Sequence, residues 1–264
     1  MLSHTLIGSP DAPAAVVFCH GILGSGRNWR SFARRLIAAL DGQWCAVLVD
    51  LRNHGDSSRA EPPHTVAACA EDLATLSRTL RPFDAVVGHS FGGKVALAYT
   101  ATLPEALSLS WILDACPGPL VGAPDSHEVP RVIAALRAIP LPLQRREQVQ
   151  AHLQEQGFSI GIARWMTTNL QRGADGLTWR FDLDAVEEMI GDYFTQDLWD
   201  TVEVPIMDLD IHLVRAELSE RWDDAMCARA RDSFATLHTL PDAGHWVHAD
   251  NPEGLLAMML PSFG

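Results

Sequence analysis

The sequence is short of basic charge, because its 20 lysine and arginine residues stand against 33 acidic residues and give a formal net charge of −13. Nucleic acids and anionic membrane surfaces both require a basic face on a protein partner. We therefore expect neither class of partner. A small anionic substrate is not excluded, since the local field of a pocket can differ in sign from the total charge.

Long apolar runs and paired cysteines are also lacking. No stretch reaches the length of a membrane span, and the first ten residues do not show the basic start and apolar run of a secretory signal. The five cysteines are scattered, without a C-x-x-C pair or a zinc-type spacing. These absences predict a cytoplasmic protein of a reducing compartment that holds no metal.

The residues that are present predict an α/β fold. With 264 residues, of which 47% are hydrophobic, the chain is long enough to bury a full core. Short apolar strands alternate with helical segments, which predicts a mostly parallel sheet with helices on both faces. The expected strands are 14–20, 45–50, 84–89, 109–114, 211–216 and 235–240, and the expected helices are 29–40, 65–80, 91–103 and 219–231.

The pentapeptide Gly88-His89-Ser90-Phe91-Gly92 lies between an apolar strand and a helix of good formers. Gly-x-Ser-x-Gly in this context is typical of a nucleophile elbow, because the sharp turn strains the serine and needs nearly side-chain-free neighbours. Ser90 is thus the candidate nucleophile, and the Phe91 amide is one candidate oxyanion donor. The same stretch fits the front of a phosphate-binding loop, but Val95 stands where that loop needs Ser or Thr.

Two more segments lie where catalytic groups are expected. The loop after the first strand, 20–25, has an H-G-x-x-G pattern that favours Ile22 as the second oxyanion donor, with Leu23 as the alternative by a one-residue shift. After the last strand, Gly244-His245 is where a general base is expected, and His248 fits a structural role better. The two histidines do not indicate a metal site, since no third ligand is evident.

Residues 117–204 contain no convincing strand, only helical segments rich in large apolar residues. We interpret them as a helical cap inserted into a core formed by 1–116 and 205–264. Most of these apolar side chains belong to ordinary helix cores. For contact with a substrate, the candidates from the cap and from the loops beneath it are His20, Leu23, His89, Trp165 and Trp246.

Taken together, four motifs resemble the α/β-hydrolase superfamily: 20–25, 50–57, 88–94 and 243–250. More narrowly, they are similar to the branch with small bacterial carboxylesterases and the mitochondrial eleventh member of the α/β-hydrolase-domain-containing proteins. The resemblance spans nearly the whole chain. It implies that Ser90 is the nucleophile, that His245 is the base, that the amides of Ile22 and Phe91 bind the oxyanion, and that acyl esters are hydrolysed.

The acid of the triad is ambiguous. Most members of the superfamily carry it after the penultimate strand, where this chain has Ser219 near the usual position. The esterase branch instead uses an aspartate after the strand that follows the elbow helix, and this matches Asp114. We favour Asp114, with Glu217 and Glu220 as alternatives that would otherwise be surface acids.

The sequence thus predicts a serine carboxylesterase that hydrolyses short-to-medium acyl esters, or thioesters, through an acyl-enzyme on Ser90 and without a cofactor. One alternative is a lyase of the menaquinone-pathway type on the same fold, which the segment 20–29 also resembles, although those lyases carry Tyr in place of His89. The other is a non-catalytic binding protein on a hydrolase frame. Acyl length, alcohol preference and oligomeric state do not follow from the sequence.

Overall fold

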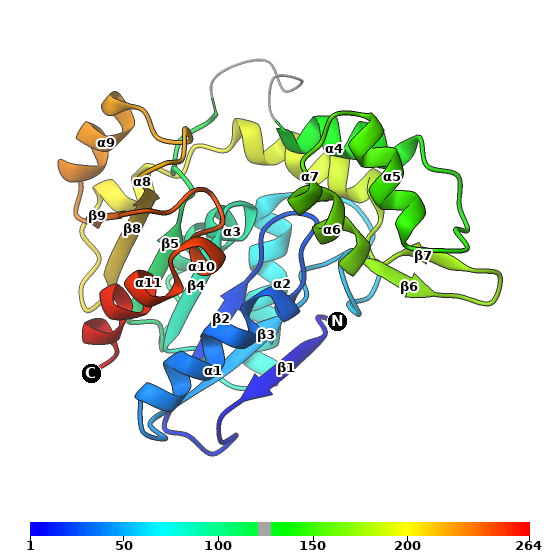
Figure 1. Ribbon diagram of the computed structural model, residues 1–264. Coiled ribbons are helices and arrows are strands. Elements are labelled where there is room, and N and C mark those ends of the chain that lie inside the picture. The colour runs from blue at the N-terminus through cyan, green and yellow to red at the C-terminus, as the bar shows by residue number, and fades with distance from the viewer. Residues whose placement is uncertain (121–127) are drawn as a thin grey trace.

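The computed structural model describes residues 1–120 and 128–264 and is built around a seven-stranded sheet (Figure 1). The strands follow the spatial order β1-β3-β2-β4-β5-β8-β9. Strand β1 is antiparallel to β3, and all other neighbours are parallel. Their bounds are β1 His4–Ile7, β2 Ala14–Cys19, β3 Trp44–Val49, β4 Ala85–His89, β5 Leu109–Leu113, β8 Asp210–Ala216 and β9 Thr236–Leu240.

Helices cover both faces of the sheet, as the sequence predicts. Strand side chains alternate between two cores: Val17 of β2 packs beneath α2 (Val66–Thr79) and α3 (Phe91–Ala101), and Phe18 packs beneath α1 (Arg30–Ala39) and α11 (Pro252–Met259). A parallel sheet buried on both faces reads as continuous apolar runs for this reason. In Figure 1, α1 and α11 lie in front of the sheet, and α2 and α3 lie behind it.

Two elements differ from the sequence prediction near the ends of the sheet. Strand β1 was not predicted, because three of its four residues are exposed and its pattern is polar at the start. The helix expected over 219–231 begins only at Asp224, as α9 (Asp224–Arg231). Asp223 caps it by accepting a hydrogen bond from the Met226 amide. The residues before the cap are therefore free to form a turn.

Between β5 and β8 the chain forms a layer over the carboxyl edge of the sheet. Its helices are α4 (Glu128–Arg137), α5 (Glu147–Glu155), α6 (Ile160–Thr168), α7 (Leu183–Thr195) and α8 (Asp200–Glu203). We propose 117–204 as the bounds of this cap, of which 121–127 lie outside the described residues.

The expectation that the cap holds no strand is wrong. A small antiparallel pair, β6 (Leu170–Arg172) and β7 (Leu177–Trp179), projects from it in Figure 1. The turn between them is closed by the Gly173 amide, which donates to the Gly176 carbonyl over 2.7 Å. Gly176 has φ +148°, a conformation that other residues rarely adopt. Three-residue strands are too short for a periodic pattern to reveal.

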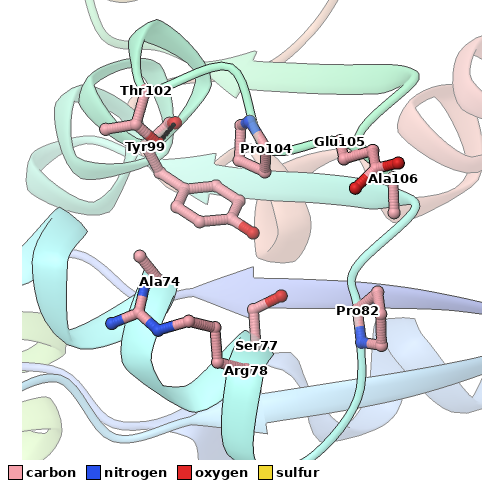
Figure 2. Close-up of a pocket in the computed structure, with 9 residues that line it drawn as sticks. All are labelled: Ala74, Ser77, Arg78, Pro82, Tyr99, Thr102, Pro104, Glu105 and Ala106. Atoms are coloured by element: carbon pink, nitrogen blue, oxygen red, sulfur yellow. Dashed lines mark hydrogen bonds between the residues drawn. The ribbon is translucent and has the colours of Figure 1, made fainter.

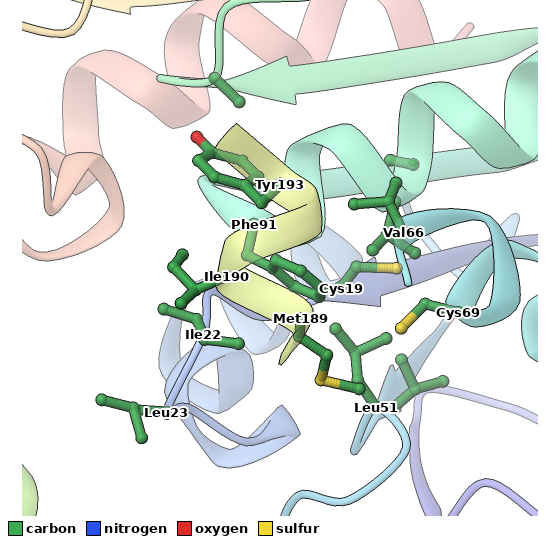
Figure 3. Close-up of a cluster of buried hydrophobic side chains, with 14 of the residues drawn as sticks. Cys19, Ile22, Leu23, Leu51, Val66, Cys69, Phe91, Met189, Ile190 and Tyr193 are labelled. Atoms are coloured by element: carbon green, nitrogen blue, oxygen red, sulfur yellow. The ribbon is translucent and has the colours of Figure 1, made fainter. Parts of the chain in front are cut away.

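Helix α7 of the cap packs directly on the elbow and on the loop after β2. Figure 3 shows Met189, Ile190 and Tyr193 of α7 facing Phe91 and Ile22 within one buried cluster. The rings of Tyr193 and Phe91 have centroids 5.9 Å apart. The apolar face of the cap therefore closes over the backbone that would bind an oxyanion.

Lys94, the one lysine in the sequence, fastens the cap to the elbow helix. Its side chain is fully buried in α3, and its Nζ donates to the carbonyls of Gly118, Tyr193 and Gln196 over 2.7, 2.9 and 2.9 Å. Burial lowers the pKa of Lys94 to about 8. Three carbonyls take the place of a carboxylate partner, so both ends of the cap are held at this one ammonium group.

Among the helices of the described residues, none combines the length and apolar character needed to cross a membrane.

Candidate active site

Ser90 occupies the turn between β4 and α3 in a strained conformation, with φ 54° and ψ −121°. The glycines of the motif are required by space. A Cβ on Gly88 would lie 2.0 Å from the Gly92 carbonyl oxygen, and one on Gly92 would lie 2.4 Å from the His20 carbonyl oxygen. The turn therefore has room only for glycine on either side of the serine.

Three groups from distant parts of the chain meet at this turn. His245 Nε2 lies 3.0 Å from Ser90 Oγ, and His245 Nδ1 lies 2.7 Å from Asp114 Oδ2. A neutral imidazole with its proton on Nδ1 satisfies both contacts, donating to the carboxylate and accepting from the hydroxyl. The arrangement is that of a nucleophile, a base and an acid that orients the base.

Asp114 follows β5 and is fully buried. Besides His245, it accepts hydrogen bonds from the Ala216 amide over 3.1 Å and from Ser219 Oγ over 2.7 Å. Burial raises the pKa of Asp114, and the hydrogen bonds from Ser219 and Ala216 act in the opposite direction. Ser219, near the usual acid position of the superfamily, therefore donates to the carboxylate that His245 contacts.

The two alternative acids are not brought to His245. Glu217 is exposed and accepts a hydrogen bond from the Asp242 amide over 3.0 Å, and Glu220 is exposed as well. His89, which precedes the serine, has its Nε2 2.6 Å from the carbonyl oxygen of His245. His89 thereby holds the backbone of the histidine that contacts Ser90.

Burial lowers the pKa of His245 well below its ordinary value, and the charge of Arg221 and the nearby His248 act in the same direction. The ring is therefore uncharged at neutral pH. An uncharged ring beside a hydroxyl is in the state that a general base requires before it accepts a proton.

The lowered pKa predicts the acid side of the pH profile. Since the imidazolium form cannot accept the proton of Ser90, we expect kcat/KM for an uncharged ester to stay constant from mildly alkaline pH down past 6.5, the ordinary value for histidine. The rate should fall only in more acid solution. Initial rates over a pH series would measure this, with each sample returned to neutral pH to exclude unfolding. A limb centred at 6.5 or above would contradict the prediction.

The loop after β2 lies against the elbow. A Cβ on Gly21 would be only 3.5 Å from the Cβ of Ser90. The amide of Leu23 donates to His54 Nε2 over 3.1 Å and is therefore occupied. Among the hydrogen bonds of the described residues, the amides of Ile22 and Phe91 have no acceptor. Of the two alternatives from the sequence, the geometry favours Ile22 over Leu23 as an oxyanion donor.

The expectation that His20 contacts substrate disagrees with the structure. His20 is buried, its Nε2 accepts from the Leu51 amide over 3.0 Å, and its Nδ1 lies 2.7 Å from the Gly21 carbonyl oxygen. Burial lowers the pKa of His20 to about 4 and that of the adjacent His54 to about 3. Both rings are neutral and brace the loop that carries Ile22. His54 has this role without having been singled out from the sequence.

A narrow pocket of about 30 Å³ opens onto Ser90 and His245. Of the predicted substrate contacts, Leu23, His89, Trp165 and Trp246 line it and His20 does not. The rings of Trp165 and Trp246 meet edge to face with centroids 4.5 Å apart. The same two rings also line an outer groove of about 530 Å³. The two tryptophans thus border both the tight pocket at Ser90 and the roomier groove.

A larger hollow lies at the opposite edge of the sheet (Figure 2). It is lined by Arg78 of α2, Tyr99 of α3 and Glu105 of the loop after α3, among others, and Figure 2 shows the Tyr99 ring facing across it toward Ser77. No histidine or cysteine lines it. The hydroxyl groups that line it, such as that of Ser77, therefore have no histidine in the same hollow to act as a base.

Within the described residues, no three histidine, cysteine, aspartate or glutamate side chains stand close enough together to hold a metal ion. The histidine pair 245 and 248 is used otherwise: His245 contacts Ser90 and Asp114, and the His248 ring packs on Trp29 with centroids 4.6 Å apart.

A sequence model described as "Alpha/beta hydrolase family" matches residues 16–258. The sn-1-specific diacylglycerol lipase ABHD11 of Mus musculus is 28% identical over 263 residues, which cover 97% of this chain and 82% of the mouse protein.

Esterase YbfF of Escherichia coli (strain K12) is 28% identical over 254 residues, or 91% of this chain and 89% of the bacterial protein. Among solved structures, a marine microorganism esterase superimposes with a TM-score of 0.85 at 26% identity and covers 98% of both chains. The similarity extends over the cap as well as the sheet.

Proposed function

This chain belongs to the alpha/beta hydrolase family, and we propose that it is a serine carboxylesterase that hydrolyses short-to-medium acyl esters through an acyl-enzyme on Ser90. The observation that carries the proposal is the unbroken chain of hydrogen bonds from Ser90 through His245 to Asp114. Similarity to proteins named esterase or lipase, which extends over most of their length, supports a hydrolase.

In the proposed first half-reaction, Ser90 Oγ attacks the carbonyl carbon of the ester and its proton passes to His245 Nε2. The negative charge that develops on the carbonyl oxygen is held by the amides of Ile22 and Phe91. Asp114 keeps the ring in the tautomer that can accept the proton, and it stabilises the imidazolium that forms. The tetrahedral intermediate collapses as His245 gives its proton to the departing alkoxide.

In the second half-reaction, water takes the place of the alcohol. His245 accepts a proton from the water as its oxygen attacks the acyl carbon on Ser90. The same two amides hold the second oxyanion, and the proton then returns to Ser90 Oγ as the carboxylic acid leaves. Thioesters react by the same steps with a thiolate as leaving group.

The size of the proposed substrate follows from the space near Ser90. The pocket of about 30 Å³ is apolar on the cap side, where Val129, Val132 and Ile162 line it. A short acyl chain displaces few side chains there, and longer substrates extend past Trp165 and Trp246 into the outer groove of about 530 Å³.

The proposal is tested by labelling and by product analysis. A fluorophosphonate probe should modify Ser90 and stop hydrolysis, and p-nitrophenyl esters of graded chain length should show a rate optimum at short to medium chains. A binding protein on this frame would give no label. A lyase would release no carboxylic acid from simple esters. Either outcome, in protein verified as folded by thermal unfolding, would refute the esterase assignment.

A further inference from the structure

Arg221 is a charged side chain in the catalytic pocket that the proposed ester chemistry does not use. It lines the pocket together with Ser90, His245 and Trp246. Its backbone is tied to the triad, because the Arg221 amide donates to Ser219 Oγ over 3.4 Å and that hydroxyl contacts Asp114. A half-buried guanidinium is thus held at the rim of the reaction site.

The guanidinium has no carboxylate partner among the described residues. None of the ion pairs within residues 1–120 and 128–264 includes Arg221. Besides the histidines, the other ionisable residue that lines the pocket is Glu128, which is exposed at the start of α4. An arginine is always charged and its planar fork of donors matches a carboxylate, so this group is available to a ligand.

The same pocket holds a second unused donor. The indole N–H of Trp165 is buried and has no acceptor within the described part of the chain. A buried donor without an acceptor is costly, so an acceptor brought next to it by a bound ligand would gain from the contact. Together with Arg221 it places two unused donor groups in the lining of the pocket, in a chain whose total charge is strongly negative.

The charge of Arg221 also reaches the reacting groups. After burial, it is the next largest cause of the lowered pKa of His245, and it opposes the rise that burial gives to the pKa of Asp114. Arg221 lines the same pocket as Ser90 and His245, and Coulomb interactions between partly exposed groups are screened only beyond roughly 10 Å. An anionic group on that substrate would come within its reach.

We propose that Arg221 is a specificity-determining residue that selects esters carrying a carboxylate near the scissile bond, with the Trp165 N–H as a second donor. The inference rests on the proposed esterase function and names its substrate class. The net charge of the protein repels anions at long range, so the preference arises inside the pocket, where Arg221 is half-buried and the acid that lines it, Glu128, is exposed to solvent.

The test compares esters that differ only in charge. For a carboxylate on the acyl side, the pair is mono-p-nitrophenyl adipate and its methyl ester. For a carboxylate on the alcohol side, the pair is butyryloxyacetic acid and its methyl ester. Hydrolysis of this pair is measured as the release of butyrate. In one of the two pairs, we expect the wild-type protein to hydrolyse the anion with a kcat/KM at least tenfold above that of the neutral ester, mostly through KM.

Variants then locate the preference. R221Q should lower the ratio of anionic to neutral kcat/KM by about 10- to 100-fold, R221K should retain part of it, and R221E should reverse it. The matched control is R231Q, which removes the same charge from the exposed end of α9. That variant should keep the wild-type ratio. Rising salt concentration should reduce the ratio in the wild-type protein.

The outcomes separate this inference from the esterase function. If wild-type protein shows no preference in either pair, or if R221Q keeps the preference, the role of Arg221 is refuted and ester hydrolysis stands. If the wild-type protein hydrolyses neither member of either pair and no fluorophosphonate label appears, the esterase proposal itself fails. Because the readout is a ratio between two substrates on one protein sample, partial unfolding of a variant does not alter it.

Discussion

Replacing Ser90 by alanine is expected to lower kcat for p-nitrophenyl butyrate by a factor of about 10⁶, because the nucleophile and the base act as one unit. Without Oγ no acyl-enzyme forms, and only the slower attack by water near the oxyanion donors remains. The change removes one atom from a residue at φ 54°, where alanine and serine have the same backbone preferences. Initial rates and fluorophosphonate labelling measure the effect.

The control is Ser77→Ala, a half-buried serine of α2 at the opposite edge of the sheet. This variant should react with the fluorophosphonate and hydrolyse p-nitrophenyl butyrate as the wild-type protein does. Retained labelling of Ser90→Ala, or a loss of rate below tenfold, would show that another side chain attacks the ester. Mass spectrometry of the labelled peptide would then identify the residue responsible.

Replacing Asp114 by asparagine is expected to lower kcat by about 10⁴. An amide NH₂ in place of Oδ2 would donate toward His245 Nδ1, which favours the tautomer with its proton on Nε2 and leaves no acceptor for the Ser90 proton. KM should change little, since the buried carboxylate touches the base rather than the substrate pocket. The kcat of the folded variant is the measurement.

Two matched variants separate Asp114 from the other candidate acids. Glu217→Gln and Glu220→Gln each remove a carboxylate from the turn after β8, where neither side chain contacts His245. Each variant should keep kcat within about twofold of wild type. A large loss in Glu220→Gln combined with a small loss in Asp114→Asn would assign the acid to the turn after β8 instead.

The parts of the site that the sequence predicts are those fixed by local geometry. The elbow requires glycine at both 88 and 92, and these positions lie within one five-residue motif. The strand and the helix that flank the motif are strongly apolar, so the sequence alone predicts the elbow. His245 follows a clear final strand. The order of these elements also determines a parallel sheet with Ser90 and Asp114 at its carboxyl edge.

The parts that could not be predicted depend on side chains that meet across the fold. The hydrogen bond from Ser219 to Asp114 joins residues that are 105 positions apart, and no pattern near either one encodes it. His20 has the sequence context of a substrate contact, yet its two nitrogens are used by the Leu51 amide and the Gly21 carbonyl. Arg221 follows a surface-like acidic turn and gives no sign that it faces a pocket.

Lys94 has a consequence for chemical modification. Lys94 is the one lysine of the sequence, and its amine is enclosed by three carbonyls that belong to the two ends of the cap. An acylating reagent cannot reach that nitrogen while the cap is seated. The extent of modification at this position therefore reports how often the cap separates from the elbow helix, at a site the protein supplies without any engineered tag.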